Sequence, residues 1–211
     1  MASLGKHYFA RLLLASLICG FALVQDSMEA VVASMLISPV GESLSLIATA
    51  ALTGNVPTLL GAIWTLVASV AVMLGVGAGV RAWEGGSPRN LTREMSKRTQ
   101  KFSKRDVFVY ALLIGAASTT TLPSLGLTSA TAALFATGLA VAISILPPIV
   151  NAGALIYDAL GESGYVRSRT AGARPSVTKP FSPARTSFSL ACLNMAGVIV
   201  ASAATQAARL W

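Results

Sequence analysis

Charged side chains are scarce in this chain of 211 residues, because Asp, Glu, Lys and Arg together make up 11% and hydrophobic residues 54%. A soluble globular domain carries about 25% charged residues. The shortage excludes an ordinary soluble domain, and the apolar runs are about 20 residues long, as a transmembrane helix requires. We therefore predict a single transmembrane domain over residues 1–211.

Residues that bind metals or carry redox chemistry are also few. The chain has one histidine, His7, and two cysteines, Cys19 and Cys192, and it has no C-x-x-C pair. This excludes a zinc or iron–sulfur site built from a local motif, and both cysteines are expected to act as small buried hydrophobes. The sequence also lacks the Ser/His or His/Asp constellation of a membrane-embedded catalyst. We therefore expect no enzymatic activity, no metal site and no cofactor.

Positive charge is plentiful but unevenly placed. Of the 16 lysines and arginines, 13 fall in two clusters, from Arg81 to Arg105 and from Arg167 to Arg185. Neither cluster is interleaved with aromatic residues in a folded pattern, and both lie between apolar runs, so we expect no specific nucleic-acid partner. Lys and Arg are enriched in the cytosolic loops of membrane proteins. The pattern therefore predicts that loops 82–106 and 161–185 lie on the cytosolic side.

Hydropathy predicts an all-α integral membrane protein with six transmembrane helices. These cover Tyr8–Gln25, Met28–Leu52, Pro57–Val80, Val107–Leu122, Ser129–Leu160 and Ser187–Ala208. Six crossings put both basic loops on one side and both termini on the other. A re-entrant second segment keeps the loops together but moves the N-terminus to the cytosol, which suits Lys6 and Arg11. Because these two residues before an apolar run also resemble a signal peptide, the orientation of the N-terminus stays open.

Two segments resemble each other when a proline of each is aligned. The first reads ASMLISPVGESLSLI (Ala33–Ile47) and the second reads AISILPPIVNAGALI (Ala142–Ile156). Each has a proline, a polar residue three positions later and apolar flanks, and each lies in the middle span of a three-span unit. An odd number of spans per unit inverts the second unit relative to the first. We predict two inverted repeats, at about residues 8–81 and 107–208, with broken second and fifth helices.

The two helix breaks are the strongest candidates for a functional site. Proline supplies no N–H and its ring clashes with an earlier carbonyl, so backbone groups are freed that lipid cannot satisfy. A charged side chain within a span costs about 2.5–3.5 kcal/mol, so we expect Glu42 to face the interior, to be protonated or to bind a cation. A kink without function and interhelical hydrogen bonding are the alternatives. The candidate ligand or ion path comprises Pro39, Gly41, Glu42, Pro147, Pro148, Asn151 and Asn194.

Other residues have simpler predicted roles. Gly75, Gly77 and Gly79 leave the end of the third span flat enough for close helix packing, within the chain or in a homo-oligomer. Asp26 and Glu29 are expected to N-cap a helix, and Asp158 is expected at a membrane interface. The first basic loop forms either an amphipathic helix on anionic headgroups or a solvated determinant of topology. Its candidate residues are Arg89, Arg93, Lys97, Arg98, Lys101, Lys104 and Arg105.

Three stretches of the chain resemble motifs of one family, domain-of-unknown-function family 389. They read DSMEAVVASMLISPVGESLSLIATAAL (Asp26–Leu52), GLAVAISILPPIVNAGALI (Gly138–Ile156) and SFSLACLNMAGVIVAS (Ser187–Ser202). The resemblance implies a polytopic membrane domain without an established substrate, and Gly197 is assigned to helix packing. Glu42 and Ser43 stand where the family usually shows a second Gly-Pro, which alters one break and adds an acid. We expect this chain to lack the soluble N-terminal domain that many members carry.

Two functions fit these predictions. The first is a transporter or channel-like protein for a small ion or solute, with a site near the membrane midplane at the helix breaks. The second is a non-transporting structural subunit of a larger membrane assembly, either an organellar complex or a viral membrane or capsid. The expected partners are the lipid bilayer, an anionic surface at the basic loops, and further copies of the chain or other subunits.

Overall fold

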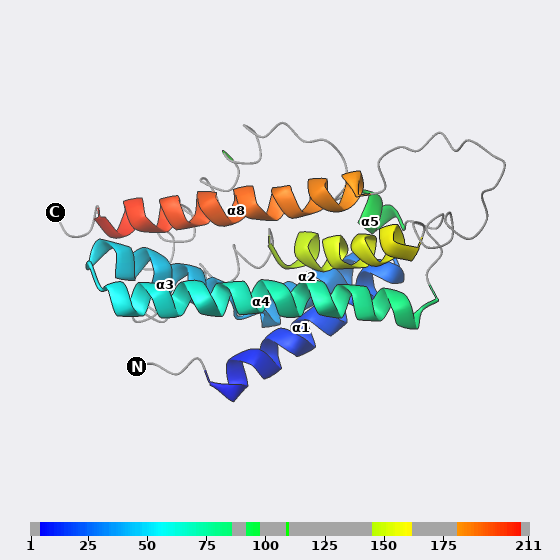
Figure 1. Cartoon of the computed structure of the whole chain (residues 1–211), viewed down its shortest axis with the longest axis horizontal. Helices are drawn as coiled ribbons and strands as arrows, with labels where there is room; N and C mark the ends of the chain where they lie inside the picture. Colours follow the sequence, from blue (N-terminus) through cyan, green and yellow to red (C-terminus); the bar gives the residue numbers. More distant parts are fainter. Residues whose placement is uncertain (1–4, 86–91, 98–108, 110–144, 162–180, 208–211) are drawn as a thin grey trace.

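The computed structural model describes residues 5–85, 92–97, 109, 145–161 and 181–207, and each element over these residues is a helix (Figure 1). The helices are α1 (Lys6–Val24), α2 (Met28–Ile37), α3 (Val40–Leu52), α4 (Val56–Trp83), α5 (Arg93–Lys97), Ile145–Gly161 and α8 (Ser182–Ala207). The fourth predicted span, apart from Val109, and the first half of the fifth lie outside the described residues.

Three of the described helices are long and apolar enough to cross a membrane, namely α1, α4 and the part of α8 from Ser182 to Ala204. They confirm the first, third and sixth predicted segments as long apolar helices. Helices α2 and α3 form a pair bent by 45°, which counts as a fourth candidate if the pair is one broken span. The Ile145–Gly161 helix is apolar but shorter. The described part of the chain is therefore all-helical with three to four candidate membrane spans.

The bend between α2 and α3 has a local cause in Ser38 and Pro39. Ser38 is extended, with φ −66° and ψ 127°, which is the conformation that a following proline favours. Pro39 is the N-cap residue of α3, and it has no N–H with which to continue the hydrogen-bond ladder of α2. The predicted break in the second segment is confirmed.

The turn between α3 and α4 is equally local in origin. Gly54 has φ +66°, a left-handed conformation that glycine adopts without steric cost. The Asn55 side chain then accepts a hydrogen bond from the backbone N–H of Thr58 at 3.2 Å and caps α4. Pro57 lies in the first turn, where its missing N–H has no partner to lose. These residues reverse the chain so that α3 packs against α4.

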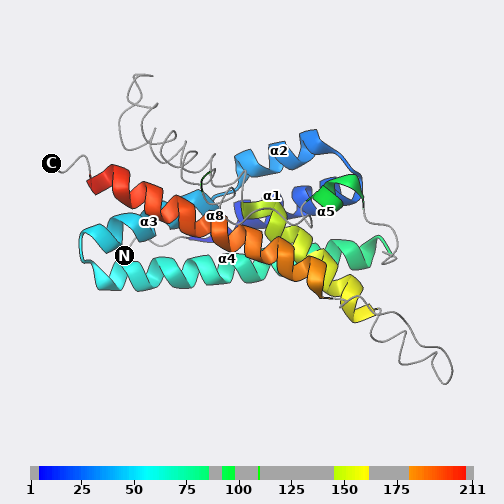
Figure 2. The same ribbon diagram turned by 90° about the horizontal axis from the view of Figure 1, so that it is seen from above.

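The helices gather into one bundle whose long axis follows α4. Helix α1 packs against α2 and α4, and α3 packs against α4 and α8. The α1–α2 turn, the C-terminal end of α4, α5 and the N-terminal end of α8 lie at the same end of the bundle, on the right of Figure 1, and Figure 2 shows the same grouping from above. We name this the α5 end. The opposite end carries the α3–α4 turn and the C-terminal end of α8.

Helix α4 crosses the Ile145–Gly161 helix at two glycines. A Cβ atom at Gly77 would collide with the Val150 carbonyl oxygen, and one at Gly153 would collide with the Leu74 carbonyl oxygen. Only glycine permits so close a backbone approach. Of the three predicted packing glycines of α4, Gly77 therefore lies at a helix crossing. Gly75 and Gly79 lie on the exposed face of α4, with open space where a Cβ would stand. Their role in packing stays a prediction, and it requires a surface outside the described residues.

Candidate functional site

The first break brings a carboxylate and a guanidinium together. Arg11 Nη1 lies 3.2 Å from Glu42 Oε1, and the two side chains are 52% and 42% exposed. Arg11 Nη2 also donates to the carbonyl oxygen of Ile37 at 3.4 Å, at the end of α2. Of the three states predicted for Glu42, the structure shows the carboxylate paired with a cation of the same chain, and its side chain is partly exposed rather than enclosed in the bundle interior. The guanidinium also satisfies a carbonyl that the break at Pro39 leaves without a helical partner.

Beside this ion pair, Tyr8 links three helices through its hydroxyl group. The Tyr8 hydroxyl lies 2.8 Å from Ser43 Oγ of α3 and 3.0 Å from Ser69 Oγ of α4, and all three side chains are buried. Ser69 Oγ donates its proton to the Thr65 carbonyl oxygen at 2.7 Å. Tyr8 must therefore donate to Ser69, and Ser43 must donate to Tyr8. We name Tyr8, Arg11, Glu42, Ser43 and Ser69 the first-break cluster.

The first-break cluster lies far from both ends of the long helix α4. Ser69 is close to the middle of α4, which runs from Val56 to Trp83. At a rise of about 1.5 Å per residue, Ser69 is about 20 Å from either end. Ser38, at the break itself, is buried, and its Oγ has no hydrogen-bond partner in the described structure. Polar groups are therefore concentrated beside the middle of α4, where the N-terminal end of α1 and the first turn of α3 meet it.

The described part of the predicted second break is one continuous helix, Ile145–Gly161, which runs through Pro147 and Pro148. The segment before Ile145 lies outside the described residues, so a break there stays a prediction. Asn151, one turn beyond the prolines, has no exposed surface. Its Nδ2 donates to the Met95 carbonyl oxygen at 3.2 Å and to Ser187 Oγ at 3.3 Å. Ser187 Oγ in turn donates to the Pro148 carbonyl oxygen at 2.9 Å. Asn151 Oδ1 has no partner within the described residues. We name Pro148, Asn151, Ser187 and the Met95 carbonyl the second-break cluster, in which an α8 hydroxyl binds a carbonyl at the break.

The two clusters lie at different heights along α4. Asn151 is next to Val150, which approaches Gly77, whereas Tyr8 contacts Ser69. Eight residues of α4 separate these two levels, which corresponds to about 12 Å. No hydrogen bond or ion pair between the described residues joins Glu42 directly to Asn151. Asn194, the other predicted path residue, is 8% exposed and lies two helical turns beyond Ser187 on α8.

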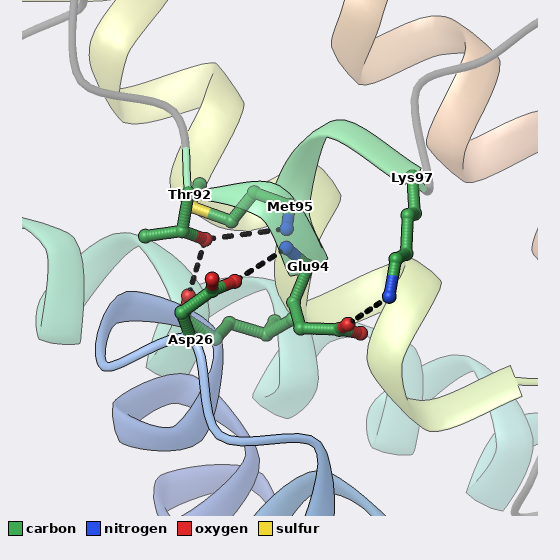
Figure 3. Close-up of polar contacts among 6 residues, drawn as sticks. Asp26, Thr92, Glu94, Met95 and Lys97 are labelled. Atoms are coloured by element: carbon green, nitrogen blue, oxygen red, sulfur yellow. Dashed lines mark hydrogen bonds and ion pairs between the residues drawn. The ribbon is translucent and has the colours of Figure 1, made fainter.

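Part of the first basic loop docks onto the bundle as α5 (Figure 3). Thr92 Oγ1 donates to the Leu23 carbonyl oxygen of α1 at 2.6 Å and accepts from the backbone N–H of Met95 at 3.3 Å. The Asp26 carboxylate accepts from the backbone N–H of Glu94 at 2.7 Å. Met95 has no exposed surface and belongs to the core. This segment is therefore neither a purely solvated loop nor an isolated surface helix.

The docking of α5 corrects the predicted role of Asp26. Ser27, not Asp26, is the N-cap of α2, where its Oγ accepts from the Ala30 N–H at 3.4 Å. Asp26 adopts φ 57° and turns its carboxylate toward α5 instead. Glu29 lies in the first turn of α2 and accepts from Ser27 Oγ at 3.3 Å. Asp26 therefore caps a helix, as predicted, but the helix is α5, a segment distant in sequence, and not the following helix α2.

The outer face of α5 carries the basic residues of this loop that the structure describes. Arg93 and Lys97 are exposed, and Lys97 Nζ pairs with Glu94 Oε1 at 2.5 Å. The other five candidate residues of the loop, Arg89, Arg98, Lys101, Lys104 and Arg105, lie outside the described residues. The helix thus presents cations outward while Met95 faces the core.

A buried ion pair joins α4 to the Ile145–Gly161 helix near the α5 end. Arg81 Nε donates to both carboxylate oxygens of Asp158, at 3.0 and 3.1 Å, and the side chains are 4% and 7% exposed. Asp158 was expected at a membrane interface, but it is enclosed by protein. Within the ranges that the structure covers, no three His, Cys, Asp or Glu side chains converge to hold a metal ion.

A comparison with family models matches residues 35–200 to the family described as Domain of unknown function (DUF389). The matched range includes both helix breaks and most of α8. Neither a search of curated proteins nor a search of solved structures finds a match to the chain. Because the family model covers most of the sequence, the chain belongs to the DUF389 family, as the three resembling stretches predicted.

Proposed function

We propose that this protein is a multi-pass membrane protein with two inverted three-helix units, and that it moves a small ion or solute past the two helix breaks. The basic loops would lie on the cytosolic side. Long apolar helices and the break at Pro39 between α2 and α3 support this architecture, together with the Pro147-Pro148 pair at the corresponding place in the second half of the sequence. The rest of the second unit that the proposal requires, residues 107–144, lies outside the described residues.

The observation that carries the proposal is the first-break cluster. A carboxylate, a guanidinium and three hydroxyl groups gather beside the middle of α4, at the N-terminal ends of α1 and α3. Ionised side chains in a membrane interior are rare, and they mark ion pathways and proton relays. Arg11 holds Glu42 in the resting state, and a permeant cation or a proton would compete for the same carboxylate.

Unpartnered oxygens at the two breaks give further support. Ser38 Oγ and Asn151 Oδ1 are both buried and without a hydrogen-bond partner in the described structure. A buried polar group without a partner costs about 1–3 kcal/mol, so an unsatisfied oxygen is retained where a water molecule or ligand satisfies it. One such oxygen lies at each break, which is the arrangement that a path between the two units requires.

The Glu42→Gln variant tests this function directly. Purified protein in liposomes would be assayed for flux over a panel of ions, including protons. We expect Glu42→Gln to slow the flux at least about tenfold, because a hydrogen bond to a charged group contributes about 1.5–3 kcal/mol.

Two substitutions control for indirect effects. Glu42→Asp keeps the carboxylate, and Glu29→Gln removes a carboxylate of α2 that lies away from the break. Both should retain most of the flux. Unchanged flux in folded Glu42→Gln protein would remove Glu42 from the mechanism.

A structural role in a larger membrane assembly is the second candidate, and the exposed face of α4 favours it. Ala71, Gly75 and Gly79 recur at intervals of four residues on this exposed face, and small residues at such spacing are typical of helix–helix interfaces. Stable co-purification with other subunits, together with the absence of flux for every ion, would favour this candidate over transport.

A further inference from the structure

Helix α5 connects the two halves of the chain at the second break. On one side, Thr92 and the Glu94 N–H bind Leu23 and Asp26 at the α1–α2 turn. On the other side, the Met95 carbonyl oxygen accepts a hydrogen bond from Asn151. The α1–α2 turn and the Ile145–Gly161 helix are therefore joined through a segment of the basic loop. Figure 3 shows Asp26 and Thr92 at the N-terminal end of this segment.

The docked state of α5 depends on these contacts. A helix of five residues is far shorter than the about 12–15 residues that an isolated helix needs in water. Two N-caps hold its first turn, one from Thr92 in the same segment and one from Asp26 across the interface. Burial of Met95 adds an apolar anchor. Because a helix this short depends on tertiary contacts, loss of the two caps favours release of the segment from the bundle.

Asn151 changes its hydrogen-bond state when α5 leaves. In the docked state one Nδ2–H binds Met95 and the other binds Ser187, while Oδ1 is already without a partner. Undocking frees one donor beside the unused acceptor. The side chain then offers both a donor and an acceptor at the second break, where the proposed path runs.

We propose that α5 is a strap that closes the second break from the α5 end, and that its release makes Asn151 available to the transported species. This gating role of α5 rests on the proposed function. Under this proposal, residues 92–97 of the basic loop control access to Asn151, in addition to any effect of their charge on membrane topology.

The test uses Met95→Cys as a probe in a background carrying Cys19→Ala and Cys192→Ser. Met95 is buried only while α5 is docked, so the rate of maleimide labelling reports the undocked population. Asp26→Ala should raise this rate about fivefold, which is the effect of losing a typical N-cap. Adding Thr92→Val should raise it to about twenty-five-fold if the two caps act independently.

Three control variants make the result specific. Asp26→Asn retains an acceptor and tolerates the left-handed backbone, Thr92→Ser retains the hydroxyl, and Glu29→Ala removes a carboxylate of the neighbouring turn that does not contact α5. All three should label like the parent. Equal labelling rates in Asp26→Ala, the double variant and the parent would overturn the proposal that α5 is a releasable strap, whatever ion flux the variants show.

Flux through liposomes, measured on the same variants without the cysteine probe, tests the gate. Faster flux in Asp26→Ala but not in Glu29→Ala supports gating by α5. Faster labelling with unchanged flux contradicts it. If the wild-type protein carries no ion, the proposed function fails and the gating role fails with it, while the labelling rates still show whether α5 is docked.

Discussion

The Arg81→Met variant should lose about 3–5 kcal/mol of stability, because breaking a buried ion pair leaves an uncompensated charge inside the protein. Asp158 would retain a carboxylate that is 7% exposed after its guanidinium partner is removed. For a chain of this size the loss corresponds to a fall of about 6–20 °C in the unfolding midpoint. Thermal unfolding of the purified protein in detergent measures it.

A second pair in the same chain supplies the control. Lys97 pairs with Glu94, but its side chain is 49% exposed, and a pair of this kind contributes about 0–1 kcal/mol. Lys97→Met should therefore leave the midpoint nearly unchanged. Adding Asp158→Asn to Arg81→Met should restore part of the loss, because the buried charge is then removed. An Arg81→Met variant with the same unfolding midpoint as wild type would contradict the burial and pairing of Arg81 with Asp158.

Gly77→Ala should destabilise the protein although alanine is the better helix former. Its Cβ would meet the Val150 carbonyl oxygen, a backbone atom that cannot rotate away. Overpacking of this kind costs about 1–3 kcal/mol, which exceeds the gain of about 1 kcal/mol in helix propensity that alanine offers. The larger Gly77→Leu substitution should separate the helices and leave no folded protein. Unfolding midpoints and size-exclusion profiles measure both effects.

The neighbouring glycines of α4 provide matched controls for Gly77→Ala. Gly75→Ala and Gly79→Ala place a methyl group in open space, so each should keep or slightly raise the midpoint. The sign of the effect thus changes between positions two residues apart. Equal effects at Gly75, Gly77 and Gly79 would contradict the crossing of α4 and the Ile145–Gly161 helix.

The sequence predicted the features that have a local chemical cause. Pro39 interrupts a helix because of its own ring, so the bend between α2 and α3 could be predicted from the sequence. The long helices followed from apolar runs of sufficient length. Family membership followed from three short stretches, which the family model confirms over residues 35–200.

The pairing of polar residues was not visible in the sequence, because it is tertiary. Glu42 was identified, but Arg11, which lies 31 positions away, was interpreted as a determinant of topology or as part of a signal peptide. Tyr8 and Ser69 are 61 positions apart, and a single serine in an apolar helix carries no signal of its partner. The i, i+3 spacing of Tyr8 and Arg11 on one helical face was the available indication of a polar cluster.

The sequence singled out three glycines of α4 together, but it did not show which of them packs against another helix. The helix is apolar on all sides, so its sequence has no polar face to show which residues point inward. The sequence therefore gives no reason to assign the helix contact to Gly75, Gly77 or Gly79. Only the position of the neighbouring helix distinguishes them. The docking of α5 could not be predicted for a related reason, because a short polar segment forms a helix only through contacts with residues distant in sequence.

The most direct test of the proposed path is whether water reaches the first break in a membrane. Ser38→Cys in a cysteine-free protein reconstituted into liposomes would be treated with a charged, membrane-impermeant thiol reagent, with Leu36→Cys as the matched control. Ser38 is buried at the break, whereas Leu36 is 54% exposed on the apolar outer surface. The path predicts that Ser38→Cys reacts and that Leu36→Cys, facing lipid, does not. Labelling of Leu36→Cys with an inert Ser38→Cys would contradict it.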